Sequence, residues 1–411
     1  MQAVSIVTAT AATGARRIED IISCPEAAPA ADRLRRMRNA MLSRRTMLTM
    51  PALGLPVLLR AQGDESGFEP LRDWIIVDGP ESAFAVAGNS VTVQAHASFP
   101  AWLRSAKEYR NFELRGEFLV DGWNDSGIYL HAPMHGYPTD AGIQIKLFHQ
   151  PEENPTPYSC GSVFPVIAPR KVVVKKGWNE FRILADDPVL RVWMNGELVQ
   201  DLNQRTHPQI RERLREGYLG IAGASCVVRL RNLRAKELPG REEWTVLYGG
   251  PEDLEKNWRV TVGKVEALAI GPVLRIDGDG LLGTKEMFRD FYLQCYVRGC
   301  AQHNSGVIFR SAGKGTDPAY SHEIQLHPVP DAHFPTGSLY HFRRSKYPRI
   351  EDEKWFLFEL WVQGRDCRVR INGETVMEYA GLNRLEPGFI ELQAHRRGYW
   401  VEFQRIRVQK L

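Results

Sequence analysis

Two stretches of the chain carry proton-transferring and hydrogen-bonding side chains at a spacing that places them on one surface. Residues 321–327 read Ser-His-Glu-Ile-Gln-Leu-His, and residues 388–395 read Gly-Phe-Ile-Glu-Leu-Gln-Ala-His. Side chains alternate between the two faces of a β-strand. Each stretch therefore predicts a strand with one apolar face and one face that carries a carboxylate, an amide and an imidazole. We expect the two polar faces to line one groove, which is the candidate site.

These residue types support more than one chemistry, and their spacing leaves the choice open. A carboxylate or imidazole can act as a general base or acid. Glu323, His327 and His395 could instead hold a divalent metal as a Lewis acid, although their spacing matches no recognised metal motif. Glu323 and Glu391 could also form the carboxylate pair of an ordinary glycosidase, whose separation decides the stereochemistry.

The elements that must position these residues occur twice. Trp178 matches Trp355, and the Asn-Gly pair at residues 195–196 matches the pair at 372–373 with the same offset. Asp-Ser-Gly at 125–127 likewise matches Asn-Ser-Gly at 304–306. A period this long indicates two copies of one domain rather than a solenoid. We expect the first at residues 70–238 and the second at 243–411.

Each copy is rich in short alternating runs separated by turn signals, which predicts an all-β sandwich. The Asn-Gly pairs predict two-residue hairpin turns, flanked by strands at 190–194 and 367–371. Other expected strands are residues 112–120, 291–297, 356–362 and 401–408. One helix is expected, at residues 208–215, because Thr206 could cap it and Gly217 could end it.

Composition and the N-terminal segment restrict the class of protein. The formal net charge is +4 over 411 residues, which indicates no polyanionic partner such as nucleic acid.

Residues 1–62 are expected to form a disordered or helical leader in which Arg44-Arg45 and the apolar run 50–59 are typical of a twin-arginine export signal. That run is too short to span a bilayer, so we expect an exported periplasmic or extracellular protein without a membrane span. The five cysteines beyond the leader include no Cys-x-x-Cys pair, which indicates free thiols.

Five motifs of the second copy resemble those of the 3-keto-disaccharide hydrolase family, in this order along the chain: aromatic-x-Asp-Phe-x-Leu (288–293), Asn-Ser-Gly-x-x-x-Arg (304–310), Glu-Ile-Gln-Leu (323–326), Thr-Gly-Ser-Leu-Tyr (336–340) and Gln-x-His (393–395). The resemblance extends over both copies. It implies two concanavalin A-like jelly-roll sandwiches in tandem, each with a ligand on its concave face. It also implies cleavage of 3-oxo-glycosides by elimination and hydration.

For that reaction the resemblance suggests roles for the polar residues of the second copy. A 3-oxo sugar has an acidified C2 proton, and Glu323 or His395 would be the base that removes it. Arg310 and Tyr340 would donate hydrogen bonds to the enolate oxygen. The side chains expected to bind substrate are Asn304, Gln325, Gln393 and Trp400. The resemblance assigns no definite cofactor, and a divalent metal remains the open alternative.

The first copy departs from this pattern. With Gly127 aligned to Gly306, His131 replaces Arg310. With Ile143-Gln144 aligned to Ile324-Gln325, Gly142 replaces Glu323 and Lys146 replaces His327. Phe164, Ala222 and Ala224 replace Tyr340, Gln393 and His395. We therefore expect the activity in the second copy, with the first as a scaffold or binding module. The alternative function is a non-catalytic periplasmic carbohydrate-binding protein built from two such modules; the oligomeric state is left open.

Overall fold

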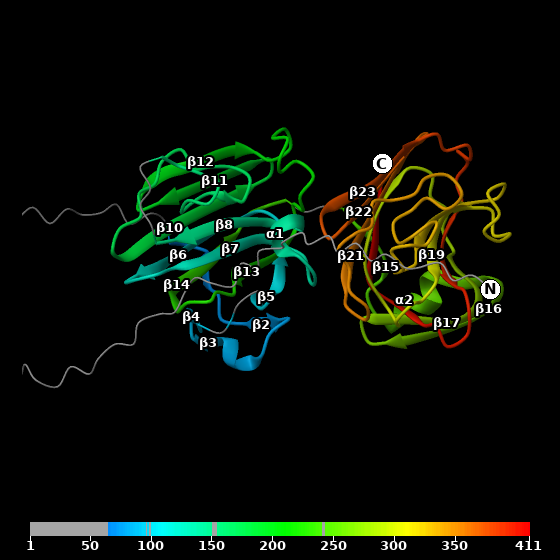
Figure 1. Cartoon of the computed structure of the whole chain (residues 1–411), viewed down its shortest axis with the longest axis horizontal. Helices are drawn as coiled ribbons and strands as arrows, with labels where there is room; N and C mark the ends of the chain where they lie inside the picture. The colour runs from blue at the N-terminus through cyan, green and yellow to red at the C-terminus, as the bar shows by residue number, and fades with distance from the viewer. Residues whose placement is uncertain (1–64, 96, 98–99, 150–153, 241–242) are drawn as a thin grey trace, which may run out of the picture. The chain divides into compact units, whose positions relative to one another are not determined.

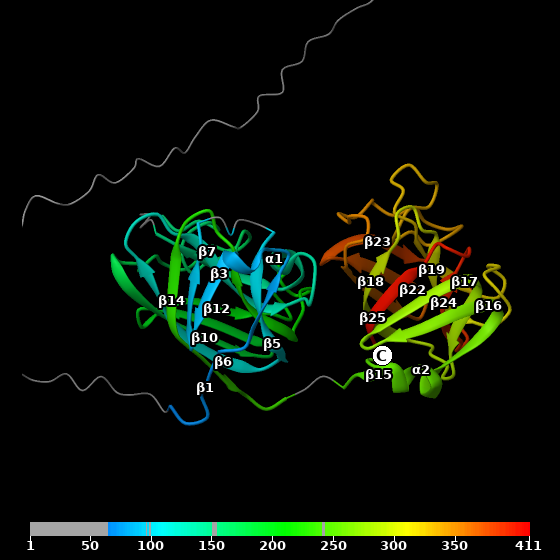
Figure 2. The same ribbon diagram turned by 90° about the horizontal axis from the view of Figure 1, so that it is seen from below.

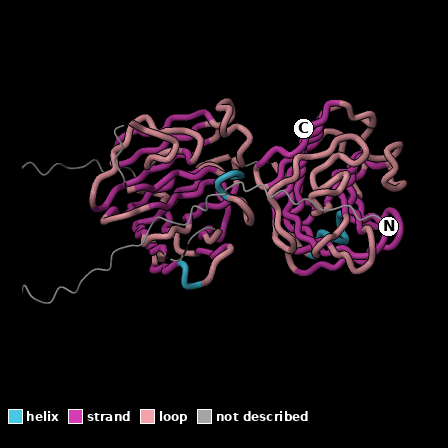
Figure 3. The backbone as a smooth tube through the Cα atoms, viewed as in Figure 1, coloured by secondary structure: helices cyan, strands magenta, loops and turns pink. Residues whose placement is uncertain are grey.

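The computed structural model describes residues 65–411 apart from residues 96, 98–99, 150–153 and 241–242 (Figure 1). The expected leader, residues 1–62 with its twin-arginine signal, lies outside the described residues. Strands account for most of what is described, and the helical segments are short (Figure 3). The all-β prediction is confirmed.

The first repeat consists of two antiparallel sheets. Its eight-stranded sheet runs β12-β11-β10-β6-β14-β4-β3, with β1 paired to β14, and its six-stranded sheet runs β2-β5-β13-β7-β8-β9. The bounds of the larger sheet are β1 (Glu69–Pro70), β3 (Phe84–Ala87), β4 (Ser90–Val93), β6 (Phe112–Val120), β10 (Gly177–Asp186), β11 (Val189–Met194), β12 (Glu197–Asn203) and β14 (Val228–Glu237). Those of the smaller sheet are β2 (Trp74–Val77), β5 (Trp102–Tyr109), β7 (Asp125–Ala132), β8 (Ile143–Phe148), β9 (Val163–Phe164) and β13 (Gly217–Ala222).

The second repeat folds one eleven-stranded sheet into the same two layers. The order is β20-β19-β24-β17-β25-β18-β21-β22-β23, with β15 paired to β25 and β16 to β17. The strands are β15 (Thr245–Tyr248), β16 (Trp258–Ile270), β17 (Val273–Thr284), β18 (Phe291–Gly299), β19 (Ser305–Ser311), β20 (His322–Leu326), β21 (Phe356–Gln363), β22 (Asp366–Ile371), β23 (Glu374–Ala380), β24 (Phe389–Ala394) and β25 (Val401–Lys410). Strand β17 belongs to both layers, because its first half pairs with β25 and its second half with β24 (Figure 2).

Local sequence signals account for much of this architecture. The expected strands at 112–120, 291–297, 356–362 and 401–408 are β6, β18, β21 and β25. Both expected Asn-Gly turns are present, with φ of 50° and 84° at Asn195-Gly196 and 50° and 82° at Asn372-Gly373. Positive φ at both central residues is the geometry that a two-residue hairpin requires.

The expected helix at residues 208–215 is wrong. These residues form successive turns, and the carbonyl oxygens of Arg213 and Leu214 accept hydrogen bonds from the Gln204 amide at 3.3 and 3.0 Å. Helices this short depend on tertiary contacts, and here those contacts hold a different conformation. The described helices are α1 (Pro138–Ala141), α2 (Pro251–Asn257) and the 3₁₀ turn η1 (Glu81–Ala83). None of the described helices has the length and apolarity needed to cross a lipid bilayer.

An apolar core lies between the two layers of each repeat. Phe112, Phe118 and Ile183 are fully buried in the first, and Phe309 and Phe403 in the second. The five described cysteines are free, as expected, and those at 160, 295 and 367 are buried. The inward faces of the strands are thus apolar, and any polar site must lie on an outward face.

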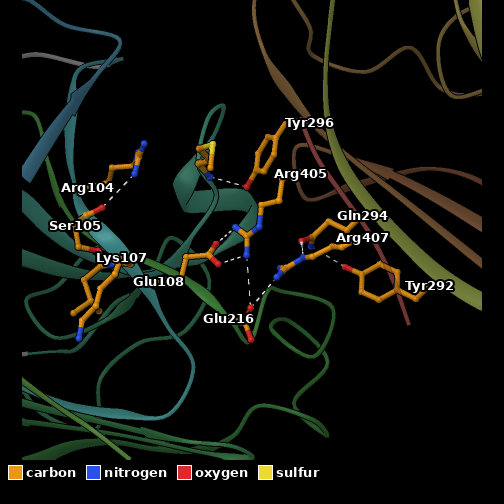
Figure 4. Close-up of polar contacts among 12 residues, drawn as sticks. Arg104, Ser105, Lys107, Glu108, Glu216, Tyr292, Gln294, Tyr296, Arg405 and Arg407 are labelled. Atoms are coloured by element: carbon orange, nitrogen blue, oxygen red, sulfur yellow. Dashed lines mark hydrogen bonds and ion pairs between the residues drawn. The ribbon is translucent and has the colours of Figure 1, made fainter. Parts of the chain in front are cut away.

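Side chains of the first repeat contact side chains of β25 in the second repeat (Figure 4). The Arg407 guanidinium donates to Glu216 and to Gln294, both at 2.8 Å. Arg405 forms an ion pair with Glu108. These contacts occupy the outward face of β18 and β25, which leaves the face of β20, β19 and β24 as the candidate site.

Candidate active site

The candidate site is the outward face of the layer β20-β19-β24-β17. Val307, Ile324 and Leu392 point into the core, so their neighbours in the chain point outward. Strand pairing aligns Glu323 with Ile308 and Ile308 with Glu391. The two carboxyl groups predicted from separate stretches therefore lie on one face, one on each side of β19.

Glu323 is a buried carboxyl group with no hydrogen bond or ion pair to its side chain among the residues that the structure describes. Its exposed fraction is 4%. Burial raises the pKa of Glu323 to about 8, because removal from water disfavours the charged form. A carboxyl group in this state can bind or release a proton near neutral pH, as an acid–base catalyst must.

Gly306 provides the space in which the Glu323 side chain lies. A Cβ atom built on Gly306 would lie 2.2 Å from Glu323 Oε1 and 2.8 Å from its Cγ. Any larger residue would displace the carboxyl group from this face. The sequence marked Gly306 only as part of an Asn-Ser-Gly motif, and its steric role depends on a strand paired through tertiary structure.

Glu391 is the second buried carboxyl group of this face. Its exposed fraction is 0%, and Thr261 Oγ1 on β16 donates to Oε1 at 2.5 Å. Burial raises the pKa of Glu391, although hydrogen bonds from Ser311 and Thr261 oppose the shift. Adjacent strands lie about 4.8 Å apart, so two strand spacings separate the backbones of Glu323 and Glu391 by about 10 Å.

A row of amides lies beside the two carboxyl groups. Gln325 is 4% exposed, and its Nε2 donates to Asn304 Oδ1 at 2.5 Å. Gln393 Oε1 is buried and accepts no hydrogen bond from the described residues. Buried polar atoms are usually paired, so an open acceptor here is consistent with a hydroxyl donor supplied by a ligand. The structure thus brings Asn304, Gln325 and Gln393 onto the face of Glu323.

Tyr340 lies next to Glu323. Its backbone N–H donates to the Glu323 carbonyl oxygen at 2.9 Å. Leu339 is fully buried in the core, so Tyr340, the next residue, projects toward the outward face. Its half-buried ring contacts Phe334 and His341 at centroid distances of 5.2 and 4.2 Å. The backbone of Tyr340 is thus paired with that of Glu323, and both side chains belong to the outward face.

The two histidines lie at the far end of the face. His395 is exposed just after β24. Burial lowers the pKa of His327, and the charge of His395 lowers it further. His327 is four residues from Glu323, or about 13 Å along an extended chain. No three His, Cys, Asp or Glu side chains within the described parts of the chain are grouped to hold a metal ion, and this holds for the candidate set of Glu323, His327 and His395.

Arg310 does not lie free on this face. Its guanidinium is fully buried and donates to the carbonyl oxygens of Arg289, Gly364 and Arg384 at 2.8–3.0 Å. It also forms an ion pair with Asp290 at 2.9 Å. These contacts tie β19 to three loops, which is a structural role, and they leave little capacity to bind an enolate oxygen.

Trp400 also lies apart from Glu323. It directly precedes β25, which pairs in the other layer, and the guanidinium of Arg275 covers its ring at 4.4 Å. The expectation that Trp400 stacks on the substrate therefore has no support in its position.

Strand register changes the correspondence between the two repeats. Gly127 pairs with Lys146 in β7–β8, as Gly306 pairs with Gln325 in β19–β20. The counterpart of Glu323 is therefore Gln144, two residues beyond the Gly142 that sequence alignment suggested. A Cβ on Gly127 would lie 2.4 Å from the Gln144 side chain, which repeats the contact between Gly306 and Glu323. The first repeat keeps the shape of the glutamate but lacks its ionisable group.

Apolar side chains fill the inner part of this face in the first repeat. Trp102, Tyr129 and Tyr218 are buried there with Ala222, the counterpart of Gln393. Trp102 meets Tyr129 edge-on at a centroid distance of 5.5 Å. Aromatic side chains thus occupy the space that amides and a carboxyl group line in the second repeat.

Comparison with known proteins identifies both repeats. A model of the 3-keto-alpha-glucoside-1,2-lyase-like domain matches residues 63–236 and 242–409. No curated protein matches the chain. A solved structure of a candidate glycosyl hydrolase from Parabacteroides distasonis ATCC 8503 is 19% identical, covers 42% of this chain and 99% of its own, and has a TM-score of 0.37. The carbohydrate-binding module CBM66 from Bacillus subtilis is 15% identical, covers 37% and 95%, and has a TM-score of 0.28.

Proposed function

Because the chain belongs to the family of 3-keto-alpha-glucoside-1,2-lyase-like domains, in two tandem copies, we propose that its second repeat cleaves 3-oxo-glycosides or 3-oxo-disaccharides. Glu323 is the group that removes the C2 proton. The observation that carries this proposal is the burial of an unpaired carboxyl group beside Gly306, with Gln144 in its place in the first repeat.

The chemistry follows from the position of the carbonyl group. Loss of the C2 proton leaves an electron pair that delocalises onto the C3 oxygen as an enolate. The Glu323 carboxylate accepts the proton, and the phenol of Tyr340 donates a hydrogen bond to the enolate oxygen. Collapse of the enolate forms the C1–C2 double bond and breaks the bond from C1 to the glycosidic oxygen, which leaves as an alcohol after taking up a proton. Water then adds across C1 and C2 to give the free 3-oxo sugar.

The amide row suits the remaining hydroxyl groups of the sugar. An amide both donates and accepts hydrogen bonds, and so does a hydroxyl group. Gln325 and Gln393 would bind the hydroxyls of the ring, with Asn304 holding Gln325 in position.

The pH profile distinguishes this reaction from that of an ordinary glycosidase. A pKa of about 8 means that Glu323 is mostly protonated at pH 7. If Glu323 is the base, kcat/KM rises as pH increases toward about 8. If Glu323 instead protonates the leaving group of a two-carboxylate glycosidase with Glu391, kcat/KM falls over the same interval.

The direct test follows monosaccharide release from a 3-oxo-disaccharide by the full chain, with and without EDTA. We expect Glu323→Gln to lower kcat at least about 100-fold, the usual contribution of a positioned acid–base group, while the fold is unchanged. The matched control is Gln144→Ala in the first repeat, which should leave release unchanged. Undiminished release by the Glu323→Gln variant would remove the proposed role.

A non-catalytic carbohydrate-binding protein is the second candidate, since an amide row with an open acceptor also suits a binding protein. It predicts that the chain binds the 3-oxo-disaccharide without releasing monosaccharide at any pH between 6 and 9.

We further propose that the protein is exported, on the basis of Arg44-Arg45 and the apolar run that follows. N-terminal sequencing of the secreted protein would test this, and a retained Arg44-Arg45 would contradict it.

A further inference from the structure

We propose that the first repeat binds neutral sugar chains through an exposed aromatic platform centred on Trp123 and Tyr158. The exposed fractions of these two side chains are 54% and 59%. They are the largest aromatic exposures among the described residues. The inference does not depend on the chemistry proposed for Glu323.

Ring contacts assemble the platform from two groups of aromatic side chains. Trp123 stacks at a tilt on His149, with centroids 4.3 Å apart, and lies 6.0 Å from Phe148. Tyr158 packs edge-on against Phe164 at 5.5 Å. The first group lies at the end of the β7–β8 pair, and the second lies at β9, which pairs with β8.

Lys146 joins these two groups. Its Nζ lies over the ring of Phe164 at 4.4 Å and over that of Phe148 at 5.8 Å. The same ammonium group forms an ion pair with Asp125, whose side chain is 40% exposed. A polar pair thus lies between two half-buried aromatic rings, with the exposed rings of Trp123 and Tyr158 to either side.

This arrangement matches the surface of a pyranose chain. Each sugar ring has an apolar face of C–H groups, which packs on aromatic rings, and a rim of hydroxyls that need hydrogen-bonding partners. The Asp125 carboxylate can accept from such hydroxyls. A purely apolar partner would remove the exposed Asp125 carboxylate from water without supplying hydrogen bonds in its place, which is costly.

The position of the platform supports a role in binding carbohydrate. By strand register, Lys146 corresponds to Gln325 and Phe148 to His327 in the second repeat. Tyr158 corresponds to Phe334, because each packs edge-on against the residue six places later, Phe164 or Tyr340. The platform therefore occupies the end of the same face that carries the candidate active site in the second repeat.

The inner part of this face cannot act in the same way. Trp102 and Tyr129 fill it, and Gln144 replaces the carboxyl group. In the first repeat, aromatic side chains thus fill the part of the face that corresponds to the candidate active site of the second repeat. The aromatic side chains at the outer end of the same face are exposed. This combination predicts binding without cleavage.

The test is the affinity of the full chain for unmodified cellohexaose and maltohexaose, measured by isothermal titration calorimetry. These sugars lack the 3-oxo group, so failure of the proposed reaction would not affect the measurement. We expect the parent chain to bind at least one of them, and Trp123→Ala to weaken that binding about ten-fold, with a smaller loss for Tyr158→Ala. Both side chains are exposed, so neither substitution should disturb folding.

Two control variants locate the binding site. Tyr320→Ala and Tyr399→Ala each remove an aromatic side chain of the second repeat, with exposed fractions of 41% and 36%. Both should leave the affinity unchanged. The proposal is overturned if the parent chain binds neither sugar, if Trp123→Ala binds as tightly as the parent, or if Tyr320→Ala or Tyr399→Ala weakens binding as much as Trp123→Ala does.

Discussion

Replacing Glu323 with glutamine should stabilise the second repeat, and the gain should grow with pH. Burial raises the pKa of the Glu323 carboxyl group from 4.5, its ordinary value when exposed in the unfolded chain, to about 8 in the folded chain. Between these values the unfolded chain has released a proton that the folded chain retains, so rising pH favours unfolding. The stability is fully present below about pH 4.5 and is lost as pH rises toward 8. Glutamine has the same shape without the ionisation.

The magnitude follows from the two pKa values. At 1.36 kcal/mol per tenfold difference in proton affinity, the carboxyl group destabilises the fold by at most about 3 kcal/mol at pH 7 and by about 5 kcal/mol once both states are ionised. The Glu323→Gln variant should therefore match the parent chain near pH 4 and exceed it by a few kcal/mol near pH 8. The first repeat already carries a glutamine at the corresponding position, Gln144, also beside a glycine.

Hydrogen exchange of peptides from β19 and β20, measured between pH 5 and 9 and corrected for intrinsic exchange, reports the stability of this repeat separately from the other. The reciprocal control is Gln144→Glu, which introduces a carboxyl group at a position only 5% exposed. It should destabilise β7 and β8 increasingly as pH rises. A difference between Glu323→Gln and the parent that is the same at every pH would refute the reasoning, because it would mean that the carboxyl group is not held protonated by burial.

Three further substitutions test the geometry of the face and the frame that holds it. Gly306→Ala would place a methyl group 2.2 Å from Glu323 Oε1. We therefore expect kcat to fall at least about 100-fold while the melting temperature changes little. An active variant would show that Glu323 acts from another position. Arg310→Met would leave three carbonyl groups and Asp290 without their donor. We therefore expect the free energy of unfolding to fall by about 3–5 kcal/mol, with an unchanged KM at low temperature. A raised KM in a folded variant would show that Arg310 contacts the substrate. Gly373→Ala should destabilise the protein more than Gly196→Ala in urea denaturation. Both glycines have positive φ, but a Cβ on Gly373 would lie 2.5 Å from the backbone of Ala141, whereas the space beside Gly196 is open. Equal losses of unfolding free energy in the two variants would contradict this.

The architecture could be predicted from the sequence because it depends on local signals. Alternation of apolar and polar residues determines which face of a strand is buried, and an Asn-Gly pair adopts the positive φ of a tight hairpin without help from distant residues. Glu323 and Gln325 could be assigned to an outward face for the same reason. The repeat was visible because residues such as Trp178 and Trp355 recur with one offset.

The roles of single residues depended on which strands pair and in what register. A shift of two residues keeps every side chain on the same face, so alternation alone could not distinguish Gly142 from Gln144 as the counterpart of Glu323. Arg310 met the sequence criteria for an oxyanion donor, and only folding brought three distant carbonyl oxygens to its guanidinium. Burial, which raises the pKa of Glu323, likewise arises from strands and loops that are far apart in the sequence. The sequence by itself therefore determined the strands, the turns and the outward polar face, whereas tertiary structure decided which of the polar side chains lie together, unpaired and removed from water.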